Sequence, residues 1–161
     1  MAIASNTTIY QTSRRYGKQE EVDQKILFTL LRRFKPQLIE NNFDQIYESL
    51  NSGLLASDKR YIGRFTDLLM AADVNPLLYM EAIPDYYLYG SQDIRELIIP
   101  RNIVRMGNCL FANSNCQKVD VHRDIILNRD SYINAPCNLK IYYEGECRIG
   151  ILWFLIELKN L

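Results

Sequence analysis

The sequence has little of the material from which catalytic and metal sites are built. It contains one histidine, His122, and four cysteines, none of which belongs to a C-x-x-C pair. A catalytic triad and a zinc ribbon each need such residues in defined combinations, so neither pattern can be assembled. The glycine-rich loops that cradle nucleotide phosphates do not occur either. We therefore expect a chain that is not an enzyme and that needs no cofactor or metal.

Long apolar runs and an excess of one charge are also absent. The longest uninterrupted apolar run spans residues 149–156, whereas a membrane-spanning helix needs about twenty residues. No apolar segment typical of a secretory signal follows Met1. Nineteen basic residues balance nineteen acidic ones, which disfavours binding of nucleic acid over the whole surface. We therefore expect a cytoplasmic protein that does not bind membranes.

The first half of the chain divides into an arm and a helical subdomain. Residues 1–18 lack apolar periodicity and acidic residues, which predicts a flexible basic arm. Over residues 19–82 the apolar residues recur at helical spacing, which predicts three helices and one short helix. The short helix is expected to start at Pro76 and to turn Leu77, Leu78 and Met80 inward.

The second half repeats an apolar pattern every twenty-two residues. Leu97 is followed by Val119 and Ile141 at this spacing, and polar residues alternate with the apolar ones around each of them. Alternation predicts short strands, and a fixed period of this length is typical of stacked repeats. We therefore predict an α+β fold. A helical subdomain would precede a short β-solenoid of about three repeats over residues 83–145, and residues 146–161 would form a C-terminal cap.

Several segments of the second half resemble one repeat family. The chain reads IPDYYLYGS at 83–91, DIRELIIP at 93–100 and NIVRMGNCLFANS at 102–114. These segments resemble the BspA-like leucine-rich repeats, and the resemblance implies protein recognition on the faces of a solenoid, without catalytic residues. The segment ADVNPLLYMEAIP at 72–84 is similar to the start of small leucine-rich-repeat proteins of bacteriophages and mobile elements.

The resemblance leads to a functional expectation with two alternatives. We expect a non-catalytic accessory protein of a bacteriophage or mobile element, located in the bacterial host cell. It would bind and block or modulate a host protein, for example a defence nuclease such as a CRISPR effector. The first alternative is a nucleic-acid-binding protein that uses the basic arm. The second is a structural or self-assembling subunit, such as a virion component, with residues 149–156 as a homo-oligomer contact.

Two groups of residues are candidates for binding a partner. The basic group comprises Arg14, Arg15 and Lys18 in the arm, with Arg32 and Arg33 at a predicted helix end. These side chains suit an anionic partner, but they also suit a solvated arm and a helix C-terminus, where cations are favourable.

The second group lies in a cluster of tyrosines, of which Tyr86 and Tyr87 are the candidate anchors and Tyr89 is expected in the core. Tyr86 and Tyr87 also suit a junction between helices and strands. His122 is expected at the surface, because it stands at a strand end. Cys116 is expected to replace an apolar core residue.

Overall fold

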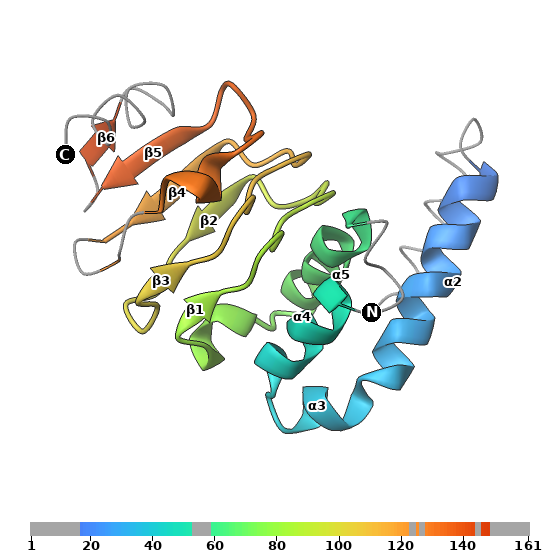
Figure 1. Ribbon diagram of the computed structural model, residues 1–161. Helices are drawn as coiled ribbons and strands as arrows, with labels where there is room; N and C mark the ends of the chain where they lie inside the picture. The colour runs from blue at the N-terminus through green and yellow to red at the C-terminus, as the bar shows by residue number, and fades with distance from the viewer. Residues whose placement is uncertain (1–16, 53–58, 123–124, 126–127, 144–145, 149–161) are drawn as a thin grey trace.

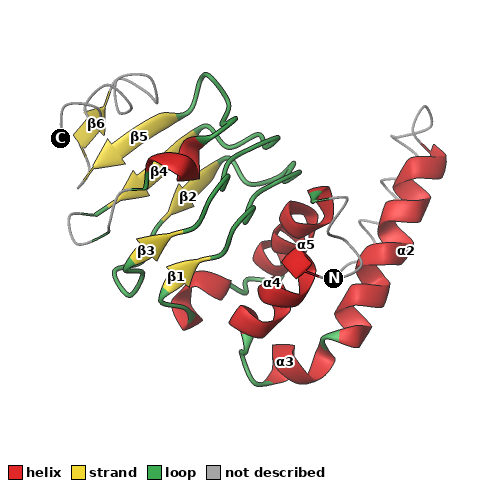
Figure 2. Cartoon of the chain, viewed as in Figure 1, coloured by secondary structure: helices red, strands yellow, loops and turns green. Residues whose placement is uncertain are grey.

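The computed structural model describes residues 17–52, 59–122, 125, 128–143 and 146–148. Within these residues the chain is of the α+β class, with helices first and short strands after them (Figure 1). The helices gather at one end of the molecule and the strands at the other (Figure 2). Residues 1–16 of the predicted arm and residues 149–161, most of the predicted C-terminal cap, lie outside the described residues.

Four α-helices build the first part of the described chain. They are α2 (Gly17–Arg33), α3 (Lys35–Ile39), α4 (Phe43–Ser52) and α5 (Arg60–Ala71). In α4 the apolar residues recur at the spacing of one helix face, and the side chains buried there are Phe43, Ile46, Tyr47 and Leu50. A proline stands in the first turn of α3, where its missing N–H leaves no hydrogen bond unmade.

A short 3-10 helix, η2 (Pro76–Tyr79), follows α5. The side chain of Asn75 caps it by accepting a hydrogen bond from the backbone N–H of Leu77 at 3.2 Å. Leu77 and Met80 are buried as predicted, but Leu78 is 58% exposed. The prediction for Leu78 was wrong: with three residues per turn, Leu77 and Met80 align on the inner face, and Leu78 lies about a third of a turn away from them.

The strands form two separate small sheets. In the first, β1 (Ala82–Ile83) pairs in parallel with β3 (Arg105–Met106). In the second, β2 (Glu96–Ile98), β4 (Lys118–Val121) and β5 (Lys140–Tyr143) are parallel neighbours. A final strand, β6 (Glu146–Arg148), runs antiparallel to β5, and a 3-10 helix, η3 (Arg129–Tyr132), lies between β4 and β5.

The predicted three-repeat β-solenoid is wrong. The twenty-two-residue spacing does set the register of the second sheet, because Leu97 pairs with Val119 and Val119 pairs with Ile141. However, β1 and β3 form a separate sheet, and the last strand of the second sheet is the antiparallel β6. A period in the sequence specifies which residues align. It does not specify that all strands join one continuous stack, so the observed arrangement is two small sheets.

One hydrophobic core connects helices and strands, since a single cluster of packed, buried residues includes both Leu27 in α2 and Ile141 in β5. Tyr47 lies at its centre, where its ring is 5.3 Å from that of Tyr87 and 6.3 Å from that of Phe65. Its hydroxyl lies 2.6 Å from that of Thr66, and the Thr66 hydroxyl is within hydrogen-bond distance of the carbonyl oxygens of Ile62 and Tyr87. Burial raises the pKa of Tyr47 far above its ordinary value, so this hydroxyl stays neutral.

Helix α5 joins the strand region through a backbone hydrogen bond and through the side chain of Asp67. Gly63 donates its N–H to the carbonyl of Tyr89 at 2.8 Å. One turn later, Asp67 accepts hydrogen bonds from the hydroxyl of Ser91 at 2.5 Å and from the N–H of Gln92 at 2.9 Å. Burial raises the pKa of Asp67, and these two hydrogen bonds counteract that rise. The contacts fix the segment that leads into β2.

Candidate protein-binding surface

The sheet of β2, β4 and β5 turns one face to the core and the other outward. Leu97, Val119 and Ile141 are all buried on the inner face. Because side chains alternate along a strand, the residues on either side of them point outward. We call this set the outer face. It consists of Glu96, Ile98, Lys118, Asp120, Lys140 and Tyr142.

Strand register arranges the outer face in two rows. Glu96, Lys118 and Lys140 align across the three strands, and Ile98, Asp120 and Tyr142 form the next row. The first row carries charge, whereas the second begins with an isoleucine that is 61% exposed. The second row thus combines an apolar, an acidic and an aromatic side chain next to a row of charged ones.

Lys118 links the two rows. Its Nζ lies 3.2 Å from Oε1 of Glu96 and 4.2 Å from the centre of the Tyr142 ring. The hydrogen bond to Glu96 raises the pKa of Lys118, so this ammonium group stays charged. A lysine held between a carboxylate and an aromatic face is ordered before any partner arrives, which reduces the entropy lost on binding.

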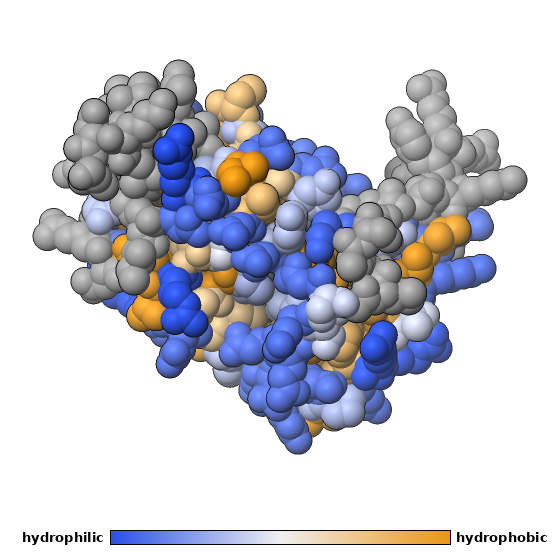
Figure 3. Space-filling view, in the orientation of Figure 1, coloured by the Kyte–Doolittle hydropathy of each residue, from blue (hydrophilic) through white to orange (hydrophobic). Residues whose placement is uncertain are grey.

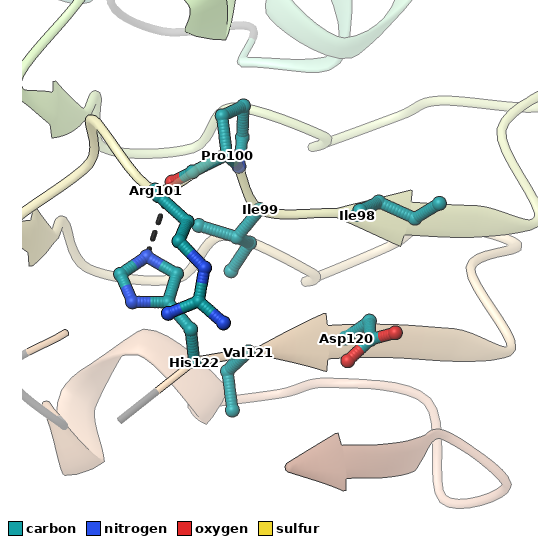
Figure 4. A pocket seen from close by; sticks show the side chains of 7 residues that line it. All are labelled: Ile98, Ile99, Pro100, Arg101, Asp120, Val121 and His122. Atoms are coloured by element: carbon teal, nitrogen blue, oxygen red, sulfur yellow. Dashed lines mark hydrogen bonds between the residues drawn. The ribbon is translucent and has the colours of Figure 1, made fainter. Parts of the chain in front are cut away.

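A pocket of about 350 Å³ opens beside the outer face, at the carboxyl ends of β2 and β4. It is lined by Ile98, Ile99, Pro100, Arg101, Asp120, Val121 and His122 (Figure 4). Arg101 and Asp120 bring opposite charges to an otherwise largely apolar lining. Because Ile98 and Asp120 belong to both features, the pocket and the outer face are continuous.

His122 is buried, with only 5% of its surface exposed, so the expectation of a surface histidine was wrong. Its Nε2 lies 3.1 Å from the carbonyl oxygen of Pro100, as the dashed line in Figure 4 shows. A carbonyl can only accept, so Nε2 carries the proton. The buried Nδ1 makes no hydrogen bond within the described part of the chain. The histidine thus ties the ends of two neighbouring strands together.

Of the five predicted basic residues, the structure describes the side chains of two, Arg32 and Arg33. Arg14 and Arg15 lie outside the described residues, and Lys18 belongs to α2 without a described side chain. Arg32 and Arg33 are exposed in the last turn of α2. The guanidinium of Arg33 lies 5.5 Å from the centre of the Phe34 ring. These two cations complement the C-terminal end of the helix dipole.

The two candidate tyrosines differ in accessibility. Tyr87 is fully buried against α4, which leaves no surface for a partner to contact. Tyr86 is half-buried, with Lys59 Nζ 4.8 Å above its ring and the Tyr89 ring 5.7 Å away. Tyr89, which was expected in the core, is also half-buried. Of the pair, only Tyr86 is available for binding.

Other exposed apolar side chains among the described residues include Ile39 in α3 and Leu78 in η2. Figure 3 shows a mainly hydrophilic face on which hydrophobic residues stand in small separate groups. Among the described residues, no three histidine, cysteine or acidic side chains gather in a way that could hold a metal ion. None of the described helices combines the length and apolar character needed to cross a bilayer.

Comparisons with known proteins add no family to this description. No protein-family model matches the chain, and neither the curated proteins nor the solved structures include a match. The similarity to BspA-like repeats therefore stays a prediction. The outer face could have been found from the sequence itself, because alternation around Leu97, Val119 and Ile141 defines it.

Proposed function

We propose that the chain is a non-catalytic protein-binding module that acts stoichiometrically through its outer face. The observation that carries the proposal is the ordered group formed by Glu96, Lys118 and Tyr142. Next to it lies Ile98, an exposed apolar residue on a strand that the core holds in place. Tyrosine is among the residues that most often anchor protein interfaces, and the exposed apolar side chain beside it adds surface that a partner can bury.

The identity of the partner is a further part of the proposal. The similarity of residues 72–84 to small bacteriophage and mobile-element proteins supports a bacterial host protein as the partner. A protein that blocks a host factor needs a preorganised surface and no reaction of its own. The outer face, continuous with the pocket beside it, supplies such a surface.

Affinity capture with matched variants tests this function. The tagged chain is used to capture proteins from bacterial lysate treated with nuclease, and the mass of the eluted complex is measured. We expect one protein at a fixed ratio. Lys118→Glu should abolish its capture, because the new carboxylate repels Glu96 and leaves Tyr142 uncovered. The control is Lys25→Glu, the same change at an exposed position on α2.

Three results would contradict the proposal. Capture that disappears with nuclease would favour the nucleic-acid alternative and the basic residues of the N-terminal region. Capture that Lys118→Glu leaves intact would exclude the outer face. Recovery of the bait alone, with a mass in solution above that of one chain, would favour self-assembly.

A further inference from the structure

Among the described strands, β2 stands at one edge of its sheet and has β4 as its only neighbour. The hydrogen bonds to β4 come from alternate residues. Lys118 donates its N–H to the carbonyl of Arg95 at 3.1 Å, and Ile99 donates to the carbonyl of Asp120 at 3.0 Å. Peptide groups alternate in direction along a strand. The N–H and C=O groups of Glu96 and Ile98 therefore point away from β4.

Those four backbone groups have no partner within the described part of the chain. Among the described residues, no hydrogen bond reaches the N–H or C=O of Glu96 or Ile98 on that side. Burying so many unpaired peptide groups would be costly, so folded proteins leave such groups open to water. The exposure of Ile98 agrees with this placement. We call this row of groups the free edge of β2.

We propose that the free edge of β2 binds an extended strand of the protein partner, which adds a strand to the sheet of β2, β4 and β5. This inference rests on the proposed function, since it specifies how a protein partner is held. Two donors and two acceptors, spaced along one side of a strand, match an extended backbone. The core behind Leu97 holds these groups in position before binding.

The neighbouring side chains define the partner segment more closely. Side chains directly opposite each other on paired strands interact, and an apolar or β-branched residue beside Ile98 would cover its exposed surface. Glu96 is still 46% exposed although it pairs with Lys118, so it can accept a second cation. The added strand should therefore carry a lysine or arginine two positions from an apolar residue. Side chains further along would reach the pocket between Ile98 and His122.

A proline substitution can remove a hydrogen-bond donor of the free edge without disturbing the fold. Ile98→Pro removes an N–H that points away from β4, so no hydrogen bond of the native sheet is lost. Proline is tolerated at such positions of edge strands, and the variant should unfold as cooperatively as the parent chain. Ile98→Val is the matched control, because it keeps both the N–H and a branched apolar side chain.

The probe is a displayed library of about ten-residue peptides with alternating polar and apolar positions, selected against the full chain. Enriched peptides should pair a basic residue with an apolar one. They should bind Ile98→Val within about threefold of the parent and Ile98→Pro at least about tenfold more weakly, since an N–H···O bond is lost. On binding, amide exchange of Glu96 and Ile98 should slow.

Other outcomes overturn the inference. A peptide that binds Ile98→Pro as tightly as the parent does not use the free edge, and neither does a selection without enriched peptides. If Ile98→Pro does not fold, amide hydrogen exchange measured on the parent chain tests the inference instead. In the free chain the amides of Glu96 and Ile98 must exchange faster than those of Leu97 and Ile99. When peptide is added, exchange must slow at Glu96 and Ile98 and stay unchanged at Leu97 and Ile99. If these two amides also exchange more slowly when the chain is concentrated without peptide, the free edge binds a second copy of the chain and not a different protein.

The two proposals fail separately. If Lys118→Glu abolishes capture of the protein partner and Ile98→Pro does not, the outer face is the binding surface and the free edge is not used. If neither variant weakens capture, both proposals are wrong. Loss of capture in both variants, with retention by Ile98→Val, supports both.

Discussion

Replacing Gly63 by alanine should destabilise the protein, although alanine is the better helix former. Gly63 lies inside α5, where the helix contacts the segment leading to β2. A Cβ at this position would lie 2.3 Å from the carbonyl oxygen of Tyr89 and 2.4 Å from the N–H nitrogen of Ser91. Both atoms belong to the backbone, so neither can rotate away as the end of a side chain could.

The magnitude follows from opposing effects. Ordinary contacts lie at 3.4–4 Å, so helix and segment must separate by about 1 Å. Such overpacking typically costs about 1–3 kcal/mol. The 2.8 Å hydrogen bond from Gly63 to Tyr89 weakens as well, at a cost of up to about 1 kcal/mol. Alanine in a helix recovers about 1 kcal/mol relative to glycine. We expect a net loss of about 2 kcal/mol.

Urea unfolding monitored by circular dichroism measures the difference in the free energy of unfolding between Gly63→Ala and the parent chain. A loss of about 2 kcal/mol should lower Tm by roughly 4–8 °C for a chain of this size. The control compares Glu48→Ala with Glu48→Gly at an exposed position in the middle of α4, where alanine should be the more stable by about 1 kcal/mol. If Gly63→Ala is as stable as the parent or more stable, α5 does not approach Tyr89 as described.

Three further predictions concern buried groups. Leu97→Asp places a carboxylate on the buried inner face and should abolish cooperative unfolding. Its control, Ile98→Asp on the outer face, should change Tm by only a few degrees. A Leu97→Asp protein that unfolds cooperatively would refute the placement of Leu97 in the core. Burial raises the folded-state pKa of Asp67 above its ordinary 3.8, so the folded state holds this proton more tightly. As pH rises from below 3.8 through the folded-state pKa, the parent should therefore lose stability relative to Asp67→Asn, as urea unfolding at a series of pH values would show; a constant difference would contradict this. Burial raises the pKa of Cys116 to about 11, so a thiol reagent should modify exposed Cys137 first and Cys116 only on unfolding; equal rates would contradict the burial.

Strand register was predictable because it depends on alternation, which the sequence displays directly. Leu97, Val119 and Ile141 had to share one face, and their equal spacing aligned them across β2, β4 and β5. The burial of Cys116 was predicted on the same basis and is confirmed. The division into two sheets was not predictable, because it depends on which backbone edges meet after the turns have formed.

Single side chains were predicted less well where a local geometry or a distant acceptor decided their position. His122 was expected at the surface because it stands at a strand end, yet the carbonyl of Pro100 accepts a hydrogen bond from it inside the protein. Nothing near His122 in sequence indicates that acceptor. Tyr86 and Tyr87 show the same limit, since adjacent residues of equal chemistry take opposite environments. Tyr86 also has a positive φ of 60°, which periodicity does not reveal.

The constant offset between paired strands has a consequence for the rate of folding. In β2, β4 and β5 each residue pairs with one twenty-two positions later in the chain. Every pairing step therefore closes a loop of the same length, and closure entropy depends only slowly on that length. Parallel sheets usually fold slowly because their partners are distant in sequence. Here the separations are short, and α5 already holds the segment before β2. The sheet can thus grow one strand at a time from the helices, without a long search for a distant partner.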